Sequence, residues 1–367
     1  MVINQGLSHL SDHFLMVTLV LYFLAVLAFA ADFAFGKRSP AEPAEAAVPE
    51  LVTAGAAGAG AAGAAAGAAQ ASAADLASAT VASATVASAT VDSAKASGGT
   101  GRPATASRPG LRDASFWVRT GLGLTVLGVI AHIAGVVSRG LAVHRVPWGD
   151  MYEFIIAVTC VAVLFFLGLI IRYRPFRLGL FFLAPIVIII GLAQTVIYTP
   201  AGPLVPALNS YWLAIHVTAI TLATGTYVVA AVLAVVYLFA DRHARRVAAG
   251  LPVRNGEVFR LLPTPERLDQ FAYRTVVFAF PLWTFGIMAG AIWADEAWGR
   301  YWGWDPTETW AFITWVVYAC FLHARVTAGW RGRRAAYIQL VGFGCLLFNL
   351  LGVSLFITGL HSYAGLS

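Results

Sequence analysis

Two histidines and a cluster of tryptophans are the residues of this chain best suited to hold a ligand. His216 lies near the start of a long apolar segment and His361 lies just after the last one, so both are expected on one side of a membrane. Six of the eleven tryptophans lie between Trp293 and Trp315. Two neutral imidazoles can occupy both axial positions of a haem iron while indole rings pack against the porphyrin. The pattern therefore predicts a six-coordinate haem site.

Two other interpretations of these histidines stay open. A mononuclear zinc site usually needs three or four protein ligands, and neither an H-E-x-x-H spacing nor a nearby cysteine supplies them. Each histidine could instead be a hydrogen-bonded polar residue of a helix bundle, although ionisable groups within a membrane are commonly functional. His144, close to Pro147 and Trp148, is a reserve candidate for the same site.

The tryptophan-rich loop 293–315 contains the segment W-G-W-D-P-T-E-T-W. Its candidate haem contacts are Trp298, Trp302, Trp304 and Trp310. Tryptophan also anchors proteins at membrane interfaces, but so many indoles in one loop exceed what anchoring requires. Asp305, Pro306 and Glu308 have the spacing of a helix start, with Asp305 as the N-cap that fixes this loop.

Three basic or ionisable residues have two interpretations each. Arg145 and Arg300 lie on the side of the tryptophan cluster, where they can pair with haem propionates or act as interfacial anchors. His323 lies about 17 residues beyond Pro306, which places it roughly 25 Å further along its helix, at the opposite boundary. It cannot join the other two histidines. It either contributes to a second, inner site or extends towards the cytoplasm beside Arg325.

The apolar segments that position these residues determine the fold class. The chain is 59% hydrophobic and 11% charged. It contains repeated runs of about 20 apolar residues, the length that a helix needs to cross a bilayer. We expect an all-α, polytopic membrane bundle of about eight helices. The expected spans are 14–35, 116–138, 151–171, 178–198, 212–240, 271–293, 306–325 and 336–358.

The basic residues predict the orientation of this bundle. Of the 24 Lys and Arg residues, 21 lie in connections on one side of the predicted spans. Basic residues are retained on the cytoplasmic side of the cell membrane. We therefore expect both termini and the tryptophan cluster outside the cytoplasmic membrane. The net charge of +6 is explained by this orientation, and nothing in the pattern indicates nucleic-acid binding.

The composition divides the chain into three regions. Residues 1–37 form the first predicted transmembrane helix. Residues 38–112 are rich in Ala, Gly and Ser, with a five-residue repeat and little to bury, so we expect a disordered cytoplasmic linker. Residues 113–367 form a membrane domain of seven predicted helices, which carries the outward loop 293–315.

Five separated motifs of the membrane domain resemble those of one known family. They are P-W-G-D-M-Y-E-F at 147–154, S-Y-W-L-A-I-H-V at 210–217, the tryptophan-aspartate segment at 298–315, L-H-A-R-V-T-A-G-W-R-G at 322–332 and G-V-S-L-F-I-T-G-L-H-S-Y-A at 352–364. In this order they resemble the haem-handling, tryptophan-rich (WWD) family of CcsA/ResC proteins, called CcsB in some bacteria, which act in System II cytochrome c biogenesis.

The resemblance implies a substrate, partners and ligands. Haem b would be exported and held outside the membrane by His216 and His361, for attachment to the C-x-x-C-H motif of an apocytochrome c. A ResB/CcsB-type membrane partner would contribute a histidine that joins His323 in an inner site. The chain would then be the integral subunit of a cytochrome c synthase complex. No catalytic side chain is assigned, and whether the chain itself is an enzyme stays open.

Two other functions are compatible with the residues. A bis-histidine electron-transfer cytochrome would keep its haem permanently, but it would need two stacked sites, and His323 has no visible partner at its depth. A cofactor-free small-molecule transporter, with tryptophans lining a gate, would be a colourless protein.

Overall fold

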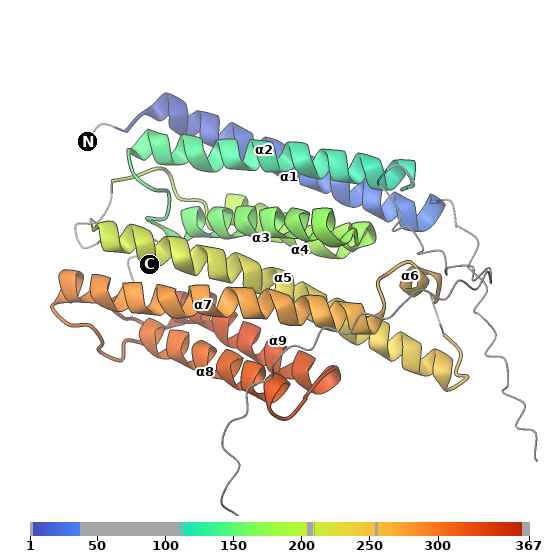
Figure 1. Ribbon diagram of the computed structural model, residues 1–367. Helices are drawn as coiled ribbons and strands as arrows, with labels where there is room; N and C mark the ends of the chain where they lie inside the picture. The colour runs from blue at the N-terminus through green and yellow to red at the C-terminus, as the bar shows by residue number, and fades with distance from the viewer. Residues whose placement is uncertain are drawn as a thin grey trace, which may run out of the picture. The chain divides into compact units, whose positions relative to one another are not determined.

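The computed structural model describes residues 3–36, 111, 114–203, 208, 210–253 and 256–361, and the regular structure of these residues is entirely helical. The helices, in chain order, are α1 (Gln5–Phe35), α2 (Phe116–Val143), α3 (Met151–Tyr173), the 3-10 helix η2 (Phe176–Leu178), α4 (Gly179–Thr195), α5 (Tyr211–Ala248), α6 (Gly256–Arg260), α7 (Pro265–Trp298), α8 (Pro306–Val326), α9 (Arg333–Leu347), the π-helix η4 (Phe348–Val353) and α10 (Ser354–Phe356) (Figure 1).

Eight helical segments of the described chain are long and apolar enough to span a membrane, which confirms the predicted all-α polytopic bundle. Each predicted span coincides with one of them. The predicted linker 38–112 lies outside the described residues, apart from Leu111. α5, with 38 residues, is about 57 Å long and exceeds the roughly 30 Å of a bilayer's hydrocarbon core.

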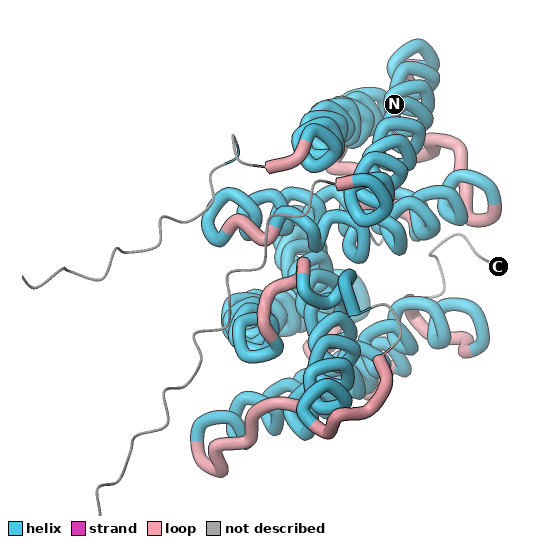
Figure 2. The backbone as a smooth tube through the Cα atoms, turned by 90° about the vertical axis from the view of Figure 1, so that its right-hand side faces the viewer, coloured by secondary structure: helices cyan, strands magenta, loops and turns pink. Residues whose placement is uncertain are grey.

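The long helices run antiparallel and pack in sequence-adjacent pairs, with α1 against α2 and α8 against α9, while α5 packs along α7 (Figures 1 and 2). We call one end of the bundle the tryptophan end, because Trp148, Trp212 and Trp298 lie there. The backbone N–H of Asn4 donates to the carbonyl of Ala142 at this end. The opposite end, where α5 ends and α9 begins, is called the arginine end.

Five of the spanning helices begin at a side chain that accepts an N–H of the first turn. The capping residues are Asn4, Ser115, Asp150, Ser210 and Asp305. Such caps satisfy donors that the helix itself leaves unpaired, which matters most beside hydrocarbon, where water cannot replace them. The sequence therefore sets where these spans start, and three of the caps lie next to residues of the site described below.

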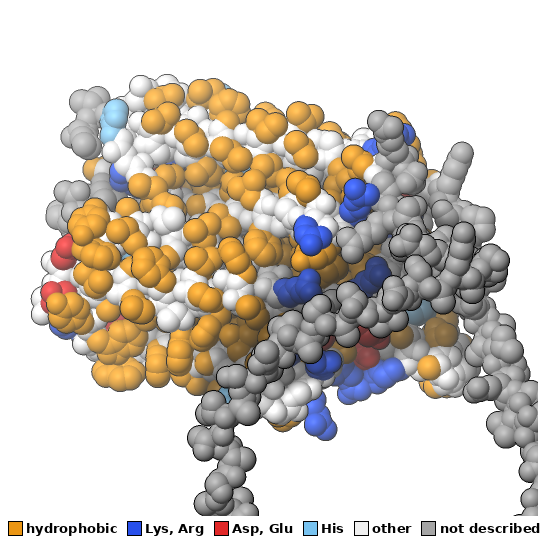
Figure 3. Space-filling model, in the orientation of Figure 1, with side chains coloured by type: hydrophobic (Ala, Val, Ile, Leu, Met, Phe, Trp, Pro, Cys, Tyr) orange, Lys and Arg blue, Asp and Glu red, His pale blue; other side chains and the backbone are white. Residues whose placement is uncertain are grey.

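Apolar side chains cover most of the visible surface of the described helices, and Lys and Arg side chains gather towards the arginine end (Figure 3). A helix surface facing lipid is expected to be apolar, because hydrocarbon cannot solvate polar groups. The gathering of basic side chains at one end is the arrangement on which the predicted orientation depends.

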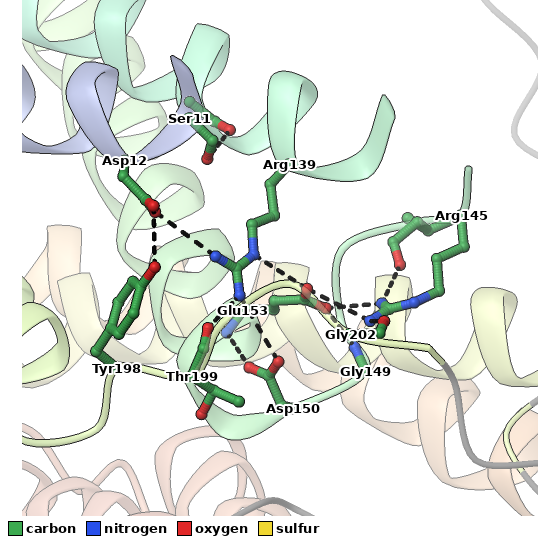
Figure 4. A network of polar contacts seen from close by, with 12 residues as sticks. Ser11, Asp12, Arg139, Arg145, Gly149, Asp150, Glu153, Tyr198, Thr199 and Gly202 are labelled. Carbon is green, nitrogen blue, oxygen red and sulfur yellow. Dashed lines mark hydrogen bonds and ion pairs between the residues drawn. The ribbon is translucent and has the colours of Figure 1, made fainter. Parts of the chain in front are cut away.

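A buried ion network joins three helices at the tryptophan end (Figure 4). The side chains of Arg139 on α2 and Glu153 on α3 are both fully buried, with Nε and Oε1 separated by 3.2 Å. The other Glu153 oxygen accepts from Arg145 at 2.7 Å. Arg139 also lies 3.6 Å from Asp12 of α1 and 4.0 Å from Asp150. The network ties the starts of α1 and α3 to the end of α2.

Backbone groups complete this network. Arg139 donates to the carbonyl of Thr199, which follows α4, and Glu153 accepts the backbone N–H of Gly149 at 2.7 Å. The Tyr198 hydroxyl donates to Asp12 at 2.9 Å. Charges buried away from water are tolerated only when they are paired and hydrogen-bonded, so the loops before α3 and after α4 are held in place by this network.

Glu153→Ala should destabilise the protein strongly, because it leaves two guanidinium groups, one of them fully buried, without their main carboxylate. We expect a loss of about 3–5 kcal/mol, measured as a large fall in melting temperature in detergent. Asp241→Ala is the matched control, since it removes a carboxylate from an exposed pair with Arg245 on α5 and should cost about 0.5 kcal/mol or less. Equal losses in both variants would contradict the role given to the network.

Candidate functional site

His216 lies in the second turn of α5, at the tryptophan end, where Ser210 caps the helix. Its Nδ1 lies 2.7 Å from the backbone carbonyl oxygen of Gly286 on α7. A carbonyl can only accept, so Nδ1 carries the proton and Nε2 keeps its lone pair. The imidazole lies nearly parallel to the buried indole of Trp293, with an interplanar angle of 12° and centroids 6.1 Å apart.

Two glycines of α7 allow the imidazole to reach this position. A Cβ added at Gly290 would lie 2.6 Å from the Nδ1 and Cε1 atoms of His216. A Cβ added at Gly286 would lie 2.6 Å from Cδ1 of Ile220. Real Cβ atoms do not approach other atoms so closely, and glycine is the residue that permits such close backbone approach. The spacing G-x-x-x-G places both glycines on the face of α7 that meets α5.

His361 reaches the same region from the C-terminal segment that follows α10. Its Nδ1 lies 2.8 Å from Oδ2 of Asp305, and the backbone N–H of Leu360 donates to Oδ1 of the same carboxylate at 2.7 Å. Asp305 also caps α8 through the N–H of Thr307. One carboxylate therefore holds the start of α8 and the residues around His361 together. A carboxylate in this position fixes the ring orientation and the tautomer of a ligating histidine.

The charge state of Asp305 suits this role. Burial by itself would raise the pKa of the Asp305 carboxyl, but the hydrogen bonds from His361 and from the Leu360 N–H outweigh it and hold the pKa below its ordinary value. The predicted capping box is confirmed, because the Glu308 carboxylate accepts the N–H of Asp305 at 3.1 Å and that of Gly303 at 2.8 Å. The loop that carries the tryptophans is therefore anchored at its last residues.

The imidazoles of His216 and His361 line two adjoining cavities of about 190 and 90 Å³. Ile220, Trp293 and Thr307 also line both cavities. The larger one extends towards α3 and the last span, where its walls are mostly apolar: Met151, Phe154, Leu213, Val217, Trp283, Leu346 and Leu350 are among its lining residues. The smaller one extends between α7 and α8. The structure thus brings together the two histidines that the sequence singled out.

The tryptophans divide into groups at different distances from the histidines. The ring of Trp298 lies 5.0 Å from that of His361, and Trp302 lines the smaller cavity. Trp304 is 66% exposed and lies edge-on to Trp302. Trp310 packs on Phe348, 4.3 Å away, and lines neither cavity.

The predicted basic partners lie outside the two cavities. Arg145 is hydrogen-bonded to Glu153, and the Arg300 guanidinium packs against the backbone of Gly303. His323 is exposed at the arginine end, and His144 ends α2 in a left-handed conformation with a φ of 53°. Neither histidine lines a cavity with His216 and His361.

Three residues that the sequence analysis did not assign to the site are part of it. Trp293 is 2% exposed, and its ring lies 5.9 Å from that of His361 as well as beside His216. The backbone carbonyl of Gly286 accepts the hydrogen bond from His216, and the lack of a side chain at Gly290 leaves space for the His216 imidazole. The G-x-x-x-G spacing in an apolar span was the available signal, since it is typical of close helix contacts in membranes.

The fold and the site together define a polytopic helical membrane protein with a paired-histidine site, lined by indoles, at one end of the bundle. Residues 148–361 match the family described as cytochrome C assembly protein, and the chain belongs to that family. This confirms the resemblance drawn from the motifs and gives the chain a role in c-type cytochrome biogenesis.

Several relatives carry the name cytochrome c biogenesis protein CcsA. The one from Guillardia theta is 38% identical over 269 residues, which are 67% of this chain and 86% of the relative. The one from Mesostigma viride is 35% identical over 239 residues, 60% of this chain and 78% of the relative. The one from Synechococcus elongatus is 40% identical over 198 residues, 44% of this chain and 61% of the relative.

Gly290→Ala should displace the His216 imidazole, because the added methyl group would occupy its place. We expect c-type cytochrome assembly in cells to fall by about tenfold or more at normal protein level, since an ångström of misplacement can cost about 100-fold. Gly168→Ala on α3 is the control, because a Cβ there meets nothing within 4 Å. Normal assembly in the Gly290 variant would show that the close contact does not matter.

The stability of the protein should depend on the charge of Asp150, which lines the larger cavity and lies just outside the α3 span. Burial, and then the neighbouring Glu153 carboxylate, raise the pKa of Asp150 to about 6. The folded state therefore binds this proton more tightly than the unfolded chain, and stability rises as the pH falls from above 6 towards 4. Asp150→Asn keeps a good N-cap and should lose this rise. Identical melting profiles of variant and wild type between pH 7.5 and 5 would contradict a contribution of Asp150 protonation to stability.

Proposed function

We propose that this protein holds haem between His216 and His361 and presents it for covalent attachment to apocytochrome c. The observation that carries the proposal is the matched hydrogen bonding of the two rings. Nδ1 of His216 donates to a backbone carbonyl and Nδ1 of His361 faces a carboxylate, so iron ligation is assigned to the Nε2 atom of each ring. Both imidazoles line the same two cavities.

The number of ligands favours haem over a bare metal ion. Among the described residues, no group of three or more His, Cys, Asp or Glu side chains could hold a metal ion. Structural and catalytic zinc sites take three or four protein ligands. A haem iron already has four nitrogen ligands from the porphyrin and needs only one or two from the protein. Two histidines and an apolar, indole-lined surrounding therefore suit a porphyrin.

The residues around the histidines would bind and orient the substrate. Trp293 and Trp298 offer faces and edges against which a porphyrin can pack, and Trp302 extends this surface into the smaller cavity. Arg145 and Arg300 stay candidates for the propionates, each after leaving its present contact. Haem b is the form proposed as cargo, because its two vinyl groups are the ones that react.

The attachment step needs no nucleophile from this chain. Each thiol of the C-x-x-C-H motif adds across one vinyl group, forming a C–S bond while its hydrogen passes to the neighbouring carbon. Thiolate character in the substrate cysteines speeds this attack. Two axial imidazoles would hold the iron and leave the porphyrin edge accessible, so the protein's contribution would be positioning. In this sense it acts as the integral subunit of a cytochrome c synthase.

The proposal places this site at the outer face of the cytoplasmic membrane and assigns a second haem contact to His323. The support for the orientation is the gathering of basic residues at the arginine end. His323 is exposed near that end of α8, beside Arg325, which pairs with Asp269 at 2.8 Å. An exposed imidazole there can meet a histidine of a ResB/CcsB-type membrane partner. Haem spectra of the protein copurified with and without such a partner test this contact.

His216→Ala and His361→Ala should each abolish c-type cytochrome maturation, because iron loses one axial ligand. Added imidazole should restore part of the activity by occupying the vacated position. The readouts are covalent haem on the reporter cytochrome and the Soret band of the purified protein.

His9→Ala is the control for these two variants, since His9 is an exposed residue of α1 at the same end of the bundle. It should mature cytochrome normally. Normal maturation in either axial variant would rule out the ligand assignment. A wild-type protein without a Soret band, even when haem is supplied, would instead support a cofactor-free transporter.

A further inference from the structure

A cleft of about 490 Å³ lies between α5 and α9 at the arginine end, far along both helices from the paired histidines. Its lining residues are Val235, Leu238, Phe239, Arg242, Arg245, Arg333 and Tyr337. None of them lines the two cavities of the histidine site. The cleft combines four apolar or aromatic side chains with three guanidinium groups, which is the composition of a site for an amphiphilic anion.

The lining residues follow one face of each helix. On α5 the set from Val235 to Arg245 has the spacing i, i+3, i+4, i+7 and i+10, which is a single stripe along a helix. On α9, Arg333 and Tyr337 are four residues apart and also share a face. The α5 stripe changes from apolar to basic over about 15 Å. This gradient matches that of a lipid leaflet, where apolar acyl chains give way to polar headgroups.

The apolar part of the stripe faces away from the bundle. Phe239 is 59% exposed, Tyr337 54% and Val235 40%. Exposed apolar side chains on a spanning helix contact lipid chains, because hydrocarbon is their only apolar neighbour outside the protein. The cleft is therefore open to the bilayer beside it.

The basic part carries charge that the described side chains compensate only at Arg245. Arg245 shares its charge with Asp241, with Nε and Oδ2 separated by 2.9 Å. Among the described residues, no carboxylate forms an ion pair with Arg242 or Arg333. Two guanidinium groups that converge on one cleft, with no carboxylate partner among the described side chains, favour an anion, and guanidinium pairs well with phosphate oxygens.

We infer that this cleft binds a diacyl phospholipid with an anionic headgroup. The phosphate lies against Arg242 and Arg333, and one acyl chain follows the apolar stripe along Phe239 and Val235. Basic pockets between transmembrane helices are suited to such headgroups. A porphyrin is less suited, because the lining residues include no His, Cys or Met that could ligate iron.

The test measures binding of phosphatidylglycerol to the purified, delipidated protein in a neutral detergent. Melting temperature and native mass spectrometry are recorded with phosphatidylglycerol, with phosphatidylcholine and with inorganic phosphate. We expect phosphatidylglycerol alone to raise the melting temperature by about 3 °C or more and to give a bound 1:1 species. Stabilisation by inorganic phosphate alone to the same extent would overturn the requirement for a lipid.

Matched double variants connect the binding to the cleft. Arg242→Gln with Arg333→Gln should lose at least half of the melting-temperature rise and of the 1:1 species. Arg172→Gln with Arg260→Gln removes the same charge from two exposed arginines outside the cleft and should keep both. The unliganded melting temperature of each variant shows whether it folds.

Three further results would overturn the inference. They are an equal response to phosphatidylcholine, an equal loss in both double variants, and displacement of phosphatidylglycerol by ferric haem with loss of haem binding in the cleft variant. The last would identify the cleft as a porphyrin site instead. None of these measurements uses cytochrome maturation, so the outcome is independent of the function proposed for the histidine pair.

Discussion

The site depends on the Asp305 carboxylate more than on any other single group. It accepts hydrogen bonds from the N–H groups of Leu360 and Thr307 and faces Nδ1 of His361. Leu360 follows the last span, and Thr307 lies in the first turn of α8. One ionised side chain therefore joins two segments that are more than 50 positions apart and sets the position of an imidazole opposite α5.

The surrounding hydrocarbon explains why so many of the polar and charged side chains described above lie at helix ends. Polar groups are tolerated in a bilayer only when they are paired internally or can reach water. The described chain meets this requirement with N-caps, with the buried network around Arg139 and Glu153, and with basic residues at the arginine end. The paired histidines follow the same pattern, since His216 lies near the start of α5 and His361 follows α10.

Hydropathy and residue spacing predicted the spans, the capping box of Asp305 and the position of His216 and His361 at the same end of the bundle, because each of these follows from local sequence. The contacts between distant helices were not predictable in the same way. The roles of Gly286 and Trp293 depend on how α7 is rotated and shifted against α5, and the engagement of Arg145 depends on Glu153 being buried nearby. Helix rotation and register arise from packing of the whole bundle, which one local pattern does not contain.

The two imidazoles differ in what can happen to them over evolutionary time. His361 relies on a side-chain acceptor, so a single codon change at position 305 can remove its support. His216 relies on a main-chain carbonyl, which every amino acid provides, and no replacement at position 286 can delete that oxygen. Substitution at position 305 can therefore remove the acceptor that faces His361, whereas substitution at position 286 can affect His216 only through the bulk of an added side chain. The supports of the two imidazoles are thus unequally tolerant of substitution.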